Sequence, residues 1–99
     1  MLNGKQRAGL RRLANTTPPI FQIGKGGISD NLVSQVDGAL ETRELVKIAI
    51  LRTAQLDTRE TCDELARRTG AEPVQAIGKR FVLYRESAEN KRINLNNLP

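Results

Sequence analysis

Histidine is absent from this 99-residue sequence, and cysteine occurs once, as Cys62. The lack of histidine excludes a His general base, a Ser–His or Cys–His nucleophile pair and a His-containing zinc site. A single cysteine excludes a Cys-rich zinc site and an internal disulfide, which fits a reducing, cytoplasmic setting. No acidic cluster has the spacing of metal ligands. The missing groups argue against an enzyme, and we expect no metal or other cofactor, although carboxylates alone would still permit a metal site.

Long apolar runs and aromatic side chains are also scarce. No stretch approaches the roughly 18 apolar residues of a membrane span, and no apolar run follows the N-terminus as it does in a signal peptide. The only aromatic residues are Phe21, Phe81 and Tyr84, and we expect the two phenylalanines in the core and favour the core for the tyrosine. Proteins that read single strands by sequence stack bases on exposed aromatic rings, so nucleic-acid recognition here should depend on backbone shape and charge. We expect neither a membrane partner nor a small-molecule substrate.

The sequence has an excess of positive charge, with 16 Lys and Arg against 11 Asp and Glu. Residues 1 to 29 carry five bases and no acid, residues 30 to 72 carry six bases and nine acids, and residues 73 to 99 carry five bases and two acids. If the fold brings the two ends together, one face becomes basic, as binding to a polyanion requires. A merely solvated basic surface is the alternative.

The periodicity of apolar residues predicts helices over 3–14, 29–42 and 58–69 and strands over 20–23, 45–51, 74–77 and 81–84. This order, α-β-α-β-α-β-β, predicts a single α/β domain with a four-stranded mixed sheet and three helices. The strand–helix–strand units imply parallel neighbours, and the last hairpin adds one antiparallel pair. We expect the domain to span residues 1–86 and to be followed by a loose tail over 87–99.

The turn Gly24, Lys25, Gly26, Gly27 has the spacing G-x-x-G and leads into a helix that Ser29 can cap. Its glycines allow the backbone to approach a ligand closely, and a helix N-terminus favours phosphate. KH domains clamp nucleic-acid backbone with such a loop. Taken alone, however, the spacing equally fits a glycine-rich turn that is needed only for steric reasons.

The predicted first helix carries four bases, Lys5, Arg7, Arg11 and Arg12, and no acid. Like charges four or seven residues apart lie side by side on a helix and destabilise it. Such an arrangement indicates an anionic partner, although side chains that simply face water would give the same pattern.

Several motifs in consistent order resemble the CRM domain (chloroplast RNA splicing and ribosome maturation), over about residues 2 to 86. The residues that carry the resemblance are Leu2, Asn3, Gly4, Lys5, Gln6, Arg7, Leu10, Arg11, Leu13, Ala14, Pro19 and Ile23 to Gly27, then Glu44 to Lys47, then Val74, Gln75, Ile77, Gly78, Lys79 and Val82 to Arg85. A stand-alone copy of this length is similar to the bacterial YhbY-type proteins. Arg80 departs from the small polar residue expected at its position, and it either extends the basic face or is a local variation.

The resemblance implies a fold similar to the C-terminal domain of bacterial translation initiation factor three. It implies RNA binding without catalysis, to rRNA in precursors of the large ribosomal subunit, in support of ribosome assembly. The implied RNA-binding residues are the G-x-x-G loop at Gly24 to Gly27 and the basic first helix, to which we add Arg80. We expect a monomer, and the alternative function is a protein-interaction adaptor that binds no RNA directly.

Overall fold

The computed structural model describes residues 2–98 of the chain. Its elements are α1 (Gly4–Ala14), β1 (Phe21–Ile23), α2 (Asp30–Arg43), β2 (Leu45–Ile50), the short 3-10 helix η1 (Arg52–Ala54), α3 (Thr58–Thr69), β3 (Glu72–Ile77) and β4 (Arg80–Tyr84). The α/β class, the three helices and the four strands are confirmed, and the sequence did not predict η1.

Polar side chains begin α2 and α3 in the way the sequence indicates. Ser29 accepts a hydrogen bond from the N–H of Leu32 at the start of α2, and Asp57 accepts one from the N–H of Glu60 at the start of α3. Helix α3 ends at Gly70, whose φ of +70° is a left-handed conformation that suits glycine. Helix α1 begins with a capping box that the sequence analysis missed, in which Asn3 and Gln6 satisfy each other's backbone N–H groups.

The strand order of the sheet is β1-β2-β4-β3. Strands β1 and β2 pair in parallel, as predicted, but β4 lies between β2 and β3 and pairs antiparallel with both. The expectations that β2 and β3 are parallel neighbours and that there is one antiparallel pair are therefore wrong. Strand β4 carries four consecutive buried residues and so belongs in the middle of the sheet. Strand β3 contains Pro73, which has no N–H to donate and is tolerated at an edge.

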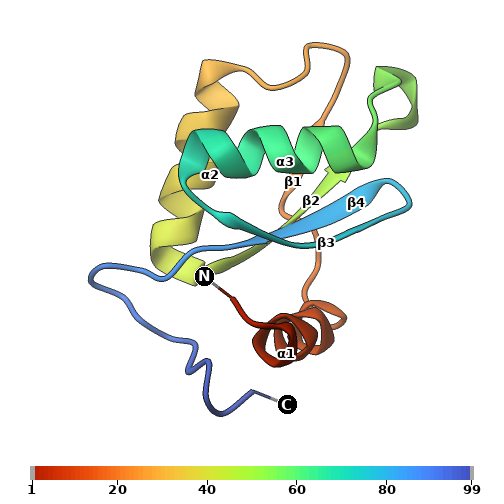
Figure 1. The fold of residues 1–99 in the computed structure, drawn as a ribbon. Helices are drawn as coiled ribbons and strands as arrows, with labels where there is room; N and C mark the ends of the chain where they lie inside the picture. The colour runs from red at the N-terminus through yellow and green to blue at the C-terminus, as the bar shows by residue number, and fades with distance from the viewer. Residues whose placement is uncertain (1, 99) are drawn as a thin grey trace.

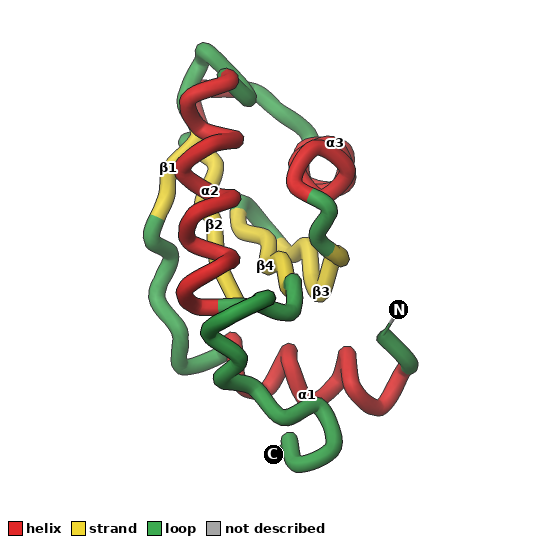
Figure 2. The backbone as a smooth tube through the Cα atoms, turned by 90° about the vertical axis from the view of Figure 1, so that its left-hand side faces the viewer, coloured by secondary structure: helices red, strands yellow, loops and turns green. Residues whose placement is uncertain are grey.

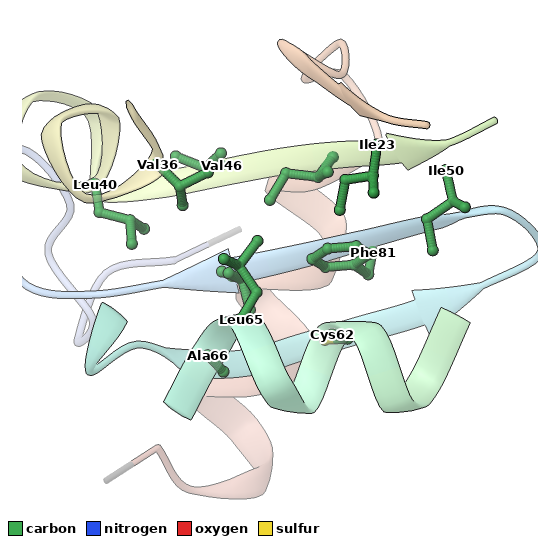
Figure 3. Close-up of a cluster of buried hydrophobic side chains, with 11 residues drawn as sticks. Ile23, Val36, Leu40, Val46, Ile50, Cys62, Leu65, Ala66 and Phe81 are labelled. Atoms are coloured by element: carbon green, nitrogen blue, oxygen red, sulfur yellow. The ribbon is translucent and has the colours of Figure 1, made fainter. Parts of the chain in front are cut away.

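The sheet is covered by α2 and α3 on one face and by α1 on the other (Figures 1 and 2). Between the sheet and the α2–α3 layer lies the larger buried cluster, in which Phe81, Leu65 and Leu40 are fully buried (Figure 3). Against α1 lies a second cluster that includes Leu10, Ala14, Val82 and Tyr84. Strand β2 contributes to both clusters and is therefore covered on both faces.

The sequence predicts a loose tail after residue 86, whereas the structure lays this segment against the domain. Leu95 and Leu98 pack on the α1 cluster, and Leu98 covers Gly9, where an added Cβ would come within 2.6 Å of the Leu98 Cβ. The N-terminal helix and the C-terminal segment thus lie side by side (Figures 1 and 2). The division into a domain of residues 1–86 and a separate tail stays a prediction.

Glu44 holds the start of this segment in place. Its side chain is completely buried, and its carboxylate accepts hydrogen bonds from the backbone N–H groups of Ser87 at 2.8 Å and of Arg92 and Ile93 at 2.7 Å each. Burial by itself would raise the pKa of this carboxyl, but the three N–H donors bring its pKa below the ordinary value of 4.5. Glu44 therefore works as a charged anchor inside the protein.

Candidate nucleic-acid interface

The G-x-x-G loop forms a tight turn immediately after β1. The N–H of Gly27 donates to the carbonyl of Gly24 at 3.0 Å, which closes the turn. Gly27 has a φ of +67°, so the backbone requires glycine there. Lys25 and Gly26, at the tip, are exposed.

Neither the backbone conformation nor the packing requires a glycine at position 26. Its φ lies outside the left-handed region, and a Cβ added to it would meet nothing within 4 Å. The bare backbone at the tip of the turn is therefore open to a ligand from outside. Access of this kind suits the close approach of a sugar–phosphate backbone.

Arg68 of α3 fixes the far side of the loop, a role that its sequence neighbourhood does not indicate. Its guanidinium donates to the carboxylate of Asp30 at 2.8 Å and to the carbonyl of Ile28 at 3.5 Å. The partner residues lie 38 and 40 positions away in the sequence, so no local pattern could have indicated the contact. Arg68 consequently positions the loop, and its charge is already partly balanced by Asp30.

The four bases of α1 fall into two pairs that point to different surroundings. Arg7 and Arg11 line a groove along β3, and the Nε of Arg7 donates to the carbonyl of Pro73 at 3.3 Å. Lys5 and Arg12 instead line a pocket that they share with residues 95 to 98. The spacings of four and seven residues put the members of each pair on the same side of the helix, but the two pairs do not form one surface.

Arg80 lies on the α1 side of the sheet. Val82 and Tyr84 pack in the α1 cluster and Phe81 and Leu83 in the other, so the alternation along β4 puts the exposed Arg80 on the α1 side. Helix α1 covers only part of this face, and Arg80 stands beyond it. Its cross-strand partners are Ala49 on β2 and Ile77 on β3.

The loop, η1 and the β3–β4 turn meet at one end of the sheet. The N–H of Leu51 donates to the carbonyl of Ile23 at 2.9 Å, and the N–H of Ile50 donates to the carbonyl of Lys79 at 2.7 Å. Lys25, Lys79 and Arg80 therefore belong to the same end. Helix α1 packs on the face of the sheet away from α2 and α3, and both views show it far from the loop (Figures 1 and 2), so the first helix and the loop are two separate basic regions.

The single cysteine is not available as a nucleophile. Burial, followed by the negative charge of Asp63, raises the pKa of the Cys62 thiol to about 12, and the side chain is fully buried. Tyr84 is also buried, so it cannot stack on a base. Residues 2–98 contain no cluster of three His, Cys, Asp or Glu side chains that could hold a metal, and no helix among them is long and apolar enough to cross a membrane.

Comparison with known proteins adds sequence and structural relatives. The family model of the CRS1 / YhbY (CRM) domain matches residues 2–85. A Bacillus subtilis protein named Probable RNA-binding protein YqeI is 45% identical over 95 residues, which make up 96% of this chain and 99% of that protein. A Haemophilus influenzae protein named RNA-binding protein is 31% identical over 90 residues, 91% of each chain.

A solved structure is similar over the full length of both chains. It is the solution structure of a hypothetical protein from Staphylococcus aureus, with a TM-score of 0.80 and 49% sequence identity.

Proposed function

Because this chain belongs to the CRS1 / YhbY (CRM) domain family, we propose that it is a non-catalytic RNA-binding protein. The names of its relatives support RNA as the partner. The observation that carries the proposal is the open turn at Gly26, where an exposed backbone stands beside the charge of Lys25 and no packing requirement explains the missing side chain.

Each group of site residues has a distinct role in this proposal. Gly24 to Gly27 admit the sugar–phosphate backbone, and Lys25 contributes a phosphate contact. Arg7 and Arg11 on α1, and Arg80 on the sheet, extend the positive potential over the α1 side of the molecule. Lys5 and Arg12 add charge on the far flank of α1, beside the C-terminal segment. Recognition depends on charge and on the shape of the RNA because the aromatic rings are taken up by packing.

A more specific proposal, on the identity of the RNA and the role of the protein, is based on the family to which the chain belongs. The RNA is rRNA in precursors of the large ribosomal subunit, and the protein assists assembly by holding a folding intermediate or by excluding a wrong one. It acts as a monomer in the cytoplasm. Sequencing of RNA crosslinked to the protein in cells tests this part, and recovery of unrelated RNAs in place of large-subunit rRNA would contradict it.

RNA binding itself is tested by titration at several salt concentrations. Affinity should fall steeply as salt rises, because each neutralised phosphate releases counterions. Lys25→Ala should lower the slope of log affinity against log salt by about one. Arg67→Ala is the matched control, since Arg67 is an exposed base on α3 that pairs with Glu64 and belongs to none of the proposed sites.

A second pair of changes tests α1. Replacing both Arg11 and Arg12 with Glu should abolish RNA binding while the thermal melt moves little, and a large loss of stability would show that the two side chains are structural. If the unmodified protein binds no RNA, or binds it without salt dependence, the adaptor function takes the place of this proposal.

A further inference from the structure

The exposed edge of β3 forms the floor of a groove of about 430 Å³ between α1 and α3. Figure 2 shows β3 at the edge of the sheet, with α3 on one side of it and α1 on the other. Arg7 and Arg11 line the groove from α1, and Arg59 lines it from α3. Among residues 2–98, those that line the groove include three arginines and no carboxylate.

The edge is built to resist pairing with another strand. Pro73 has no N–H, the register shifts between Pro73 and Gln75, and Arg7 already donates to the Pro73 carbonyl. Proline, irregular pairing and flanking charge are the devices by which proteins prevent strand addition at an edge. An extended peptide is therefore a poor occupant, and the charge in the groove needs another explanation.

Of the three arginines, Arg59 is the most open to an anion. The side chain of Arg59 is 75% exposed, and its contact with Asp63, at 3.4 Å, is long for a charged hydrogen bond. Ile77, at the end of the groove, is 65% exposed and pairs with Arg80, which links the groove to the basic end of the sheet. A guanidinium group can donate two parallel hydrogen bonds to one phosphate.

We infer that the RNA backbone crosses the edge of β3, where Arg59 from α3 and Arg7 and Arg11 from α1 donate to its phosphates. This inference rests on the proposed function and extends it to a face that the sequence analysis did not include. Arg59 lies in the stretch of residues 30 to 72, which has more acids than bases. Only the fold brings it opposite the basic first helix.

Arg59→Ala tests the inference, with Arg67→Ala as the control. Both residues are arginines of α3 with similar side-chain exposures, 75% and 71%, so the two changes remove equal charge from the same helix, although Arg67 is the more tightly paired of the two. With a fluorescently labelled large-subunit rRNA transcript as the probe, Arg59→Ala should weaken binding about five- to tenfold and lower the salt slope by about one. Arg67→Ala should stay within about twofold of the unmodified protein. In the NMR spectrum, the amides of Gln75 to Ile77 should shift when the RNA is added.

The outcomes that would contradict this inference can be told apart from those that would contradict the proposed function. Equal weakening by the two changes would mean that only net charge counts, and it would overturn the inference. So would an Arg59→Ala variant that keeps full RNA affinity while Lys25→Ala loses it, a result that would leave the proposed function intact. Binding of poly-glutamate that depends on Arg59, together with RNA binding that does not, would assign the groove to an acidic peptide. If neither the unmodified protein nor any of the variants binds RNA, the proposed function itself is wrong.

Discussion

Replacement of Glu44 should show how strongly the C-terminal segment is bound to the domain. The Glu44→Ala variant removes the buried carboxylate that accepts from the N–H groups of Ser87, Arg92 and Ile93. The same residue ends α2 with a φ of +67°, an unfavourable backbone conformation for a residue with a side chain. At Glu44 the carboxylate therefore stabilises the fold while the backbone conformation destabilises it, and two substitutions can separate these effects.

The loss of stability in Glu44→Ala can be approximated from the hydrogen bonds that the carboxylate accepts. A bond to a charged group contributes about 1.5–3 kcal/mol, but three bonds on one carboxylate are not additive. The loss is also limited because the segment can detach and hydrate its amides, giving up only its own contacts, including those of Leu95 and Leu98. We expect Glu44→Ala to lower the free energy of unfolding by about 3 kcal/mol, which corresponds to a decrease in Tm of about 12–24 °C in a domain of this size.

Glu44→Gly supplies the matched comparison. It removes the same carboxylate but relieves the left-handed backbone, so it should be about 1 kcal/mol more stable than Glu44→Ala. Urea unfolding measures both free energies, and hydrogen exchange of the Ser87, Arg92 and Ile93 amides reports whether the segment has detached. If Glu44→Ala stays within 1 kcal/mol of the unmodified protein and these amides remain protected, the carboxylate is not the anchor described above.

Two further predictions concern the G-x-x-G loop and the response to acid. Gly27→Ala should destabilise the protein by about 1–2 kcal/mol because of the positive φ at this position. Gly26→Ala should leave the thermal melt unchanged and weaken RNA binding several-fold. Equal effects of the two changes on stability would contradict the different roles given to these glycines. The folded state lowers the pKa of Glu44 and of Glu41, which accepts from the Ser87 hydroxyl, so the C-terminal contacts should be complete above about pH 4.5 and be lost as the pH falls through the lowered values. An NMR pH titration of the Ser87 amide checks this, and a signal that does not change down to the acid unfolding transition would refute it.

Local patterns determined the elements of this protein and part of its site. The caps at Ser29 and Asp57, the stop at Gly70 and the apolar periodicity act over a few residues, so the bounds of α2 and α3 followed from the sequence. The turn at Gly24 to Gly27 could be identified for the same reason, since its conformation depends on the glycines themselves. The overall charge distribution, with both ends basic, was likewise evident from the sequence alone.

Tertiary structure alone decided which residues meet. Strand β4 lies between β2 and β3 and is buried on both faces, and its run of apolar residues did not by itself specify which strands it would pair with. The bases of α1 face two different surroundings because β3 packs along one flank of the helix and the C-terminal segment along the other. Glu44 and Arg68 act on partners in other elements, which lie about 40 or more positions away in the sequence. Their roles depend on long-range contacts, which composition and spacing do not encode.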